Sequence, residues 1–220
     1  MGLVVVGVQC VAATSGKCYA RELVSVAEEL SVPLTWLICV SAGDPMGNPS
    51  LYRNEFLHRI PSWHEIGVLL DMRTANGGSQ KARMDLVRLG KEMLKQCHVK
   101  PTACWVDGGL TGDDLRVLED VGILVLVAPE PTVEATLGLY TPSYDNPNGV
   151  GSARVHRLAS PVLDVAQATP GSVGAACASS PITLLAVRDD RDETRELRAA
   201  LQEASAAGSV FRVATATLVA

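Results

Sequence analysis

Short apolar runs and longer amphipathic segments alternate along this chain. The apolar runs are rich in valine, leucine and isoleucine and carry few charges. Runs of this kind are typical of strands that are buried on both faces of a parallel sheet. We therefore expect strands at residues 3–10, 32–40, 65–70, 102–106, 123–127, 182–187 and 210–219.

Segments with helical spacing lie between these strands. In residues 19–30, the apolar side chains of Leu23, Val26 and Leu30 recur at intervals of one helical turn. Further helices are expected at residues 51–60, 80–97, 111–118 and 193–206, with Ser79 and Thr111 as N-caps of two of them. The repeated order of strand and helix predicts an α/β fold with largely parallel strands and outer helices.

Residues 129–180 interrupt this order, because they are rich in proline, glycine, serine and asparagine. A segment of this length suggests a lid, an excursion over the mouth of a barrel, or short irregular strands. A chain of 220 residues is large enough for one hydrophobic core. We therefore expect a single domain over residues 1–220, with an irregular insertion or lid at 129–180.

Composition and charge narrow the classes of partner. The net charge of -5 argues against a nucleic-acid surface and against an anionic membrane as partner. No apolar run is long enough for a membrane span, and the first residues lack the basic start of a signal peptide. The six cysteines contain no C-x-x-C pair, which favours reduced thiols. We expect a cytoplasmic protein.

Three short stretches carry a recognisable pattern. They are Val32-Pro33-Leu34-Thr35-Trp36-Leu37-Ile38, then His64-Glu65-Ile66-Gly67, and then Lys100-Pro101-Thr102-Ala103-Cys104-Trp105-Val106-Asp107-Gly108-Gly109. In this order and spacing the chain resembles the polysaccharide deacetylases, the NodB-like carbohydrate esterases. The resemblance covers residues 3–128 and 181–219. It implies a distorted (β/α) barrel of the NodB-like polysaccharide deacetylase type.

The same resemblance implies a metal reaction that this chain departs from. In that family an aspartate and two histidines hold a divalent metal, which activates water to remove N-acetyl groups from sugars. The aspartate pair of the first strand falls on Gln9 and Cys10, and the two histidines fall on Leu69 and Arg73. Leucine has no donor atom and arginine repels a cation. The resemblance therefore predicts the fold, whereas we expect no metal and no cofactor.

Functional residues in parallel β/α folds gather at the carboxyl ends of the strands. There we expect Asp71, Asp107 and Arg73 to act as acid/base residues. Alternatively, Asp71 with Arg73, and Arg188 with Asp189, form plain ion pairs at the barrel rim. The candidate substrate-binding residues are Gln9, Cys10, Trp105, Arg188 and Tyr144. His64, at the opposite end of its strand, is expected to make structural hydrogen bonds.

Three hypotheses of function follow. The first is a metal-free barrel that binds, and transforms by acid/base chemistry, a small polar or sugar-derived molecule. The second is a catalytically inactive deacetylase homologue that serves as a binding or partner subunit. The third is an amide or ester hydrolase with an unrecognised metal site. A small-molecule ligand is the expected partner, and a homo-oligomer remains an open alternative.

Overall fold

The computed structural model of the protein describes residues 2–11, 18–40, 57–75, 79–127, 138–160 and 162–219. The described strands are β1 (Leu3–Cys10), β2 (Thr35–Val40), β3 (Glu65–Asp71), β4 (Ala103–Asp107), β5 (Val125–Val127), β6 (Gly138–Tyr140), β7 (His156–Ala159), β8 (Val162–Asp164), β9 (Ile182–Arg188) and β10 (Val210–Phe211). They form one sheet in the order β6-β7-β5-β4-β3-β2-β1-β9-β8, and β10 pairs with β1. Among these strands only β6 and β7 pair antiparallel.

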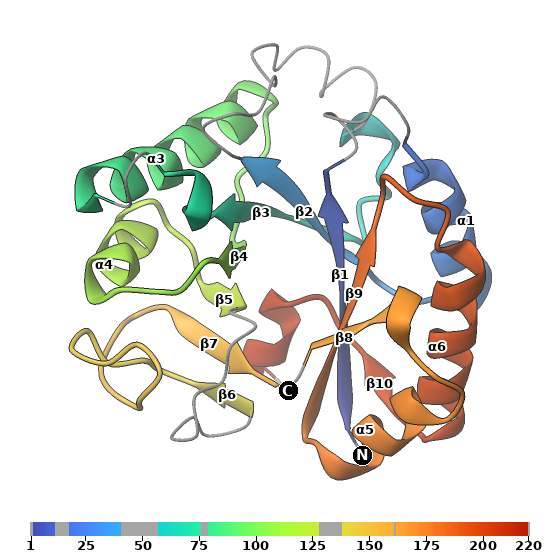
Figure 1. Ribbon diagram of the computed structural model, residues 1–220. Coiled ribbons are helices and arrows are strands. Elements are labelled where there is room, and N and C mark those ends of the chain that lie inside the picture. The colour runs from blue at the N-terminus through green and yellow to red at the C-terminus, as the bar shows by residue number, and fades with distance from the viewer. Residues whose placement is uncertain are drawn as a thin grey trace.

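Helices cover the outside of this sheet (Figure 1). They are α1 (Ala20–Leu30), α3 (Gln80–Gln96), α4 (Gly112–Asp120), α5 (Ser172–Ser179) and α6 (Thr194–Ala206). The sheet itself curls around a centre, so the architecture is the distorted (β/α) barrel expected from the sequence (Figure 1). No helix in the described ranges is both long and apolar enough to cross a membrane.

The strands separate an inner core from an outer core. Successive side chains of a strand point to opposite faces of its sheet. In β1, Val4 and Val6 pack in the outer cluster with the helices, and Val5 packs in the inner cluster. The inner cluster also contains Leu37, Leu69 and Trp105 from the next three strands. This alternation determines which side chains at the carboxyl ends of the strands lie on the inner face of the barrel.

The two predicted N-caps are confirmed. The hydroxyl oxygen of Ser79 accepts a hydrogen bond from the amide of Ala82 at the start of α3 (3.3 Å). Thr111 and Asp114 form a reciprocal capping box at the start of α4. The helix expected at residues 51–60 lies largely outside the described residues, and its end, Leu57–Arg59, is a turn of 3-10 helix.

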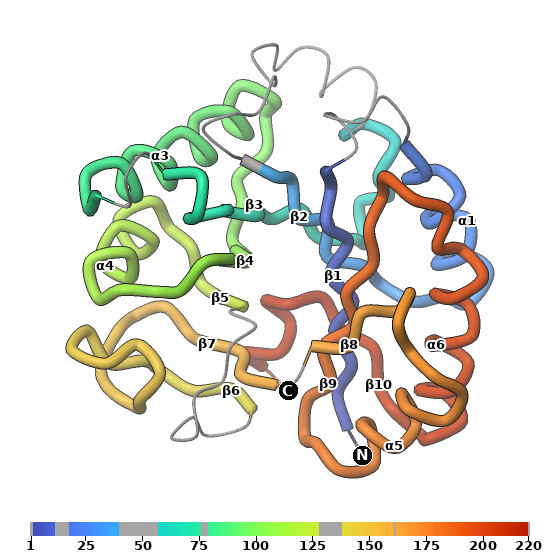
Figure 2. The backbone as a smooth tube through the Cα atoms, in the orientation of Figure 1, coloured from blue at the N-terminus to red at the C-terminus, as the bar shows by residue number. Residues whose placement is uncertain are grey.

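The final strand predicted at residues 210–219 is wrong beyond its first two residues. Only Val210 and Phe211 form β10, and Thr215–Val219 form a 3-10 helix. The reason is Glu65 at the start of β3, whose carboxylate accepts a hydrogen bond from the Thr215 hydroxyl (2.6 Å). The segment therefore turns across the end of the barrel close to the start of β1 (Figure 2).

The irregular segment contributes to the sheet where it is described. Strands β6 and β7 extend one edge beyond β5, and β8 pairs with β9 near the other edge. Within this segment the short strands are β6, β7 and β8, and residues 172–179 form the helix α5. Residues 128–137 and 161 lie outside the described part of the chain.

Candidate functional site

Parallel pairing brings the predicted rim residues to one edge in two groups. Asp71 is in register with Asp107 on the adjacent strands β3 and β4. Gln9 is in register with Arg188 on β1 and β9. Each of these residues lies two positions after an inner-face residue of its own strand. All four side chains therefore start from the inner face at the carboxyl ends of the strands.

Asp71, Arg73 and Asp107 form an ion-paired set. The guanidinium of Arg73 donates to both carboxylate oxygens of Asp71, from Nε to Oδ1 (2.7 Å) and from Nη2 to Oδ2 (3.0 Å). The same Nη2 lies 3.9 Å from Oδ2 of Asp107. These hydrogen bonds to Asp71 raise the pKa of Arg73. The cation of Arg73 is thus neutralised by two carboxylates, although 67% of its side chain is exposed.

Trp105 fills the barrel beneath this set. Its ring is 2% exposed, and its Nε1 donates to Oδ1 of Asp107 (2.9 Å). A side chain at Gly7 on β1 would begin only 3.2 Å from the ring, so the glycine leaves room for the indole. A void of about 10 Å³ remains beside it, which is too small for an organic ligand. Trp105 therefore closes the inside of the barrel below Asp107.

The loop after β4 is built to hold Arg73 in place. Gly108 has a φ of 90°, and a side chain there would begin 2.7 Å from Cγ of Arg73. Behind the loop, Arg83 of α3 forms a buried ion pair with Asp114 of α4 (2.5 Å). Arg83 also donates to the carbonyl oxygen of Gly109 (3.0 Å). Sequence reasoning missed the Arg83–Asp114 pair. The only local signal was the position of Asp114 in the cap of α4.

On the other side of the rim, Arg188 pairs with Asp190. Nε and Nη2 of Arg188 donate to the two carboxylate oxygens of Asp190 (2.9 and 2.7 Å), which raises the pKa of Arg188 and lowers that of Asp190. The ion-pair partner expected for Arg188 was Asp189, which is instead buried and accepts a hydrogen bond from the amide of Val11 (2.8 Å). The reason is strand alternation, which turns Asp189 to the outer face. Gln9 is half-buried beside this pair.

Two candidate substrate-binding residues lie away from the rim set. Cys10 packs in the outer core between sheet and helices, where burial raises the pKa of its thiol well above the usual value. Tyr144 lies against α4, and its hydroxyl donates to the carboxylate of Glu119 (2.8 and 2.9 Å). The guanidinium of Arg116 lies 4.9 Å from the centre of the Tyr144 ring. The structure thus does not bring Cys10 or Tyr144 together with Asp71 and Asp107.

The His64-Glu65 pair stands at the opposite, amino-terminal end of the barrel. Nδ1 of His64 accepts from Nε1 of Trp36 (2.8 Å), and burial lowers the pKa of His64 to about 4. Its role in structural hydrogen bonding agrees with the expectation. The carboxylate of Glu65 accepts from the hydroxyls of Thr35 (3.1 Å) and Thr215 (2.6 Å). Sequence reasoning did not assign this role to Glu65. The available signal was a glutamate at the start of an apolar strand.

The residues present do not fit the metal of the deacetylases. Leu69, on one of the two positions that correspond to ligand histidines, packs in the apolar inner cluster. Arg73, on the other, carries a cation. In the ranges that the structure describes, no group of three His, Cys, Asp or Glu side chains is arranged to hold a metal ion. The described residues at this rim therefore offer no set of metal ligands.

No family model and no curated protein matches the sequence. Solved structures do match the fold. One is a protein assigned to the polysaccharide deacetylases from Mycobacterium smegmatis, with a TM-score of 0.68 and 14% identity over 98% of this chain and 88% of that one. A second is a mutant of a CE4 family pseudoenzyme with restored enzymatic activity, with a TM-score of 0.61 and 10% identity over 99% and 68% of the two chains.

A third similar structure is a family 4 acetyl xylan esterase from Clostridium thermocellum, solved in complex with a cobalt ion. Its TM-score is 0.54, with 12% identity over 99% of this chain and 90% of that one. At such low identities these likenesses establish the fold and leave the chemistry to the residues themselves. The fold is that of the NodB-like polysaccharide deacetylases, in a strongly diverged sequence.

Proposed function

We propose that this protein is a deacetylase-like barrel that binds a small polar or sugar-derived molecule at its rim and does not hydrolyse it. The ligand would lie over Asp71, Arg73 and Asp107, with Gln9 and Arg188 on the opposite side. Ion-paired side chains of this kind still offer hydrogen-bonding atoms to hydroxyl and amide groups. The proposal takes its ligand from the first hypothesis from the sequence and the absence of catalysis from the second.

The observation that carries the proposal is the position of Trp105. Hydrolysis of an amide requires a group that polarises the substrate carbonyl and a group that activates water. The indole of Trp105 occupies the inside of the barrel, and its N–H is bonded to the carboxylate of Asp107. Asp71 is bound on both oxygens by Arg73. These contacts commit the acidic groups to the protein itself.

The similar structures supply a precedent. One of them is described as a mutant of a pseudoenzyme in which enzymatic activity has been restored. A barrel of this type can therefore exist without activity. This precedent supports a loss of hydrolysis for the present chain, whose ligand positions hold Leu69 and Arg73.

A second candidate is acid/base chemistry at Asp71, Asp107 and Arg73, the leading hypothesis from the sequence. The observation in its favour is that the side chains of Asp71 and Asp107 retain 21% and 25% exposure at the rim. Both carboxylates are thus accessible to a bound molecule. The two candidates differ in whether a bound molecule is turned over.

The experiment measures binding and acetate release on the same samples. N-acetylglucosamine, glucosamine and chitobiose are titrated by calorimetry, and acetate release is followed with and without added cobalt or zinc. We expect saturable binding of at least one sugar with no acetate released. Arg73→Gln should weaken that binding by about tenfold, because a charge-assisted hydrogen bond is lost. Arg212→Gln, an exposed arginine on another part of the chain, is the matched control.

Three results would contradict the proposal. The first is the absence of binding across the sugar panel. The second is acetate release that Asp107→Asn abolishes, which would establish the acid/base reaction. The third is release that depends on added metal, which would establish the hydrolase with an unforeseen metal site.

A further inference from the structure

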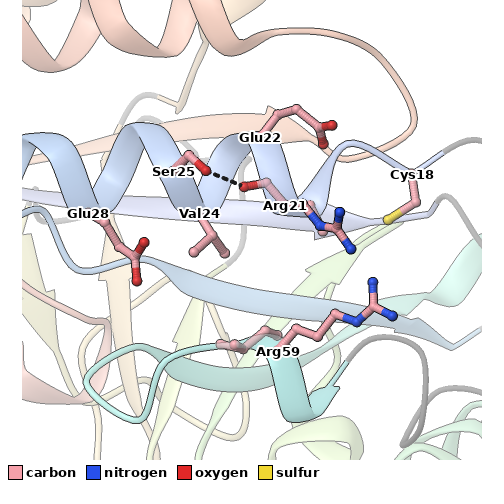
Figure 3. A pocket seen from close by; sticks show the side chains of 9 residues that line it. Cys18, Arg21, Glu22, Val24, Ser25, Glu28 and Arg59 are labelled. Atoms are coloured by element: carbon pink, nitrogen blue, oxygen red, sulfur yellow. Dashed lines mark hydrogen bonds between the residues drawn. The ribbon is translucent and has the colours of Figure 1, made fainter.

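A second cavity lies outside the barrel, between α1 and the turn at Leu57–Arg59 (Figure 3). Its volume is about 550 Å³, within the usual range of small-molecule sites. Residues of α1 line one side, and Arg59 and Ile60 line the other. None of the rim candidates Asp71, Asp107 or Arg188 belongs to it. This cavity is independent of the proposed rim site.

The spacing along α1 places its polar groups at the two ends of the cavity. Arg21, Val24, Ser25 and Glu28 recur at three- and four-residue intervals, so they share one face of the helix. Glu28 follows Arg21 by seven positions, which corresponds to about 10 Å along the helix axis. Figure 3 shows the Arg21 and Glu28 side chains at opposite ends of the cavity.

Two guanidinium groups meet at one of these ends. Arg21 from α1 and Arg59 from the facing turn extend toward the same part of the cavity (Figure 3). Among the residues that the structure describes, Arg21 forms no ion pair. Arginine recognises carboxylate and phosphate groups through paired hydrogen bonds. Two arginines from separate elements therefore lie at this end of the cavity, which Glu22 also lines.

The middle and the far end have a different character. Val24 and Ile60 are apolar side chains that pack partly on the core and line the cavity. Glu28 at the far end accepts hydrogen bonds from an ammonium or hydroxyl group. The cavity thus presents two arginines at one end, an apolar middle and the carboxylate of Glu28 at the far end, in that order.

We propose that this cavity binds an organic anion, with its carboxylate or phosphate on Arg21 and Arg59 and its apolar body against Val24 and Ile60. A second group that donates hydrogen bonds lies toward Glu28. The occupant is thus a small amphipathic molecule about two helical turns long. Carboxylate and phosphate share the chemistry that the arginine pair recognises, and the choice between them is left to the test.

The test uses simple probes on the full chain, with binding measured by calorimetry or NMR titration. The probes are para-toluate, phenyl phosphate, inorganic phosphate and neutral benzyl alcohol. We expect saturable binding of para-toluate or phenyl phosphate, and the tighter of the two identifies the anionic group. Arg21→Gln and Arg59→Gln should each weaken that binding by about tenfold. Arg195→Gln, an exposed arginine of α6, should leave it unchanged.

The acidic end is tested with a matched pair of probes. Para-aminomethylbenzoate carries an ammonium group where para-toluate carries only a methyl group. We expect the ammonium to improve affinity by about threefold, as for other exposed ion pairs. Glu28→Gln should remove this difference while leaving the binding of para-toluate no weaker, because a like charge is lost.

Four outcomes would overturn the proposal. They are no saturable binding of any anion at millimolar concentration, equal binding of benzyl alcohol, inorganic phosphate binding as tightly as phenyl phosphate, and arginine variants that behave like Arg195→Gln. Circular dichroism of each variant verifies that the fold is retained. Since the rim residues are untouched, sugar binding at the rim should persist in all these variants.

Discussion

The two ends of the barrel use carboxylates in opposite ways. At the amino-terminal end, Glu65 is buried and its oxygens accept from the hydroxyls of Thr35 and Thr215. At the carboxyl-terminal end, Asp71 and Asp107 are partly exposed and face the guanidinium of Arg73. The first end closes the barrel with the last segment of the chain, whereas the second leaves its polar groups at the surface.

The contrast between the two ends explains the role of the His-Glu-Ile-Gly motif in this chain. His64 holds the indole of Trp36, and Glu65 anchors Thr215 from the end of the chain. Both residues therefore serve the closed end of the barrel. The retained half of the family motif is explained by the fold, and the altered half, from Leu69 to Arg73, lies at the end where chemistry would take place.

We expect the largest loss of stability when Trp105, which packs inside the barrel below Asp107, is truncated. Trp105→Ala removes a buried indole from a barrel centre that has almost no free volume. We expect the free energy of unfolding to fall by about 3–5 kcal/mol, measured by urea denaturation. Trp105→Phe keeps most of the packing and lacks the hydrogen bond to Asp107, so its free energy of unfolding should fall much less. Equal losses for both variants would contradict a packing role for the ring.

The next effect compares carboxylates at the two ends. Glu65→Ala leaves the hydroxyls of Thr35 and Thr215 without their hydrogen-bond acceptor. We expect a loss of about 2–4 kcal/mol in the free energy of unfolding. Asp71→Ala, the matched change at the rim, removes an exposed ion pair and should cost about 1 kcal/mol or less. Urea denaturation of both variants measures the contrast. Similar losses would erase the distinction between the two ends.

A smaller effect is expected at Gly108. Its φ of 90° and its contact with Arg73 leave no room for a side chain. Gly108→Ala should lower the free energy of unfolding by about 1–2 kcal/mol through backbone strain. Gly109→Ala also has a positive φ but meets no atom within 4 Å, so it is the matched control for the steric part. A smaller loss for Gly108→Ala than for Gly109→Ala would refute the close contact with Arg73.

The smallest effect is a pH dependence from the closed end. Burial lowers the pKa of His64 from 6.5 to about 4. Between these values the unfolded chain binds more protons than the folded one, so stability falls as the pH falls through this range. We expect this histidine to contribute about 1 kcal/mol of the loss between pH 7 and pH 5.5.

The matched variants for this pH dependence are His64→Asn and His98→Asn. Asparagine at residue 64 retains an acceptor for Trp36 but cannot titrate. His98 is exposed and has a φ of 61°, a conformation that asparagine tolerates. Urea denaturation at both pH values should give a flatter profile for His64→Asn alone. An unchanged profile for that variant would remove His64 as the source.

The alternation of strands and helices could be predicted from the amino-acid pattern alone. Apolar runs and helical spacing depend on neighbouring residues, so they identified β1, α3, α4 and the caps Ser79 and Thr111. The family pattern added the barrel. The order of the chain also indicated that Asp71 and Asp107 lie at the carboxyl ends of consecutive strands. The structure then pairs these two strands and sets the two aspartates in register.

Which of these side chains already have partners could be identified only from their three-dimensional contacts. Thr215 meets Glu65 across 150 residues of sequence, and no local pattern announces a contact of that length, so the final strand was predicted too long. The outward turn of Cys10 and Asp189 likewise depends on the exact register of β1 and β9. Whether an acid is available for chemistry depends on three-dimensional neighbours, here Trp105 and Arg73, which residue spacing alone does not specify.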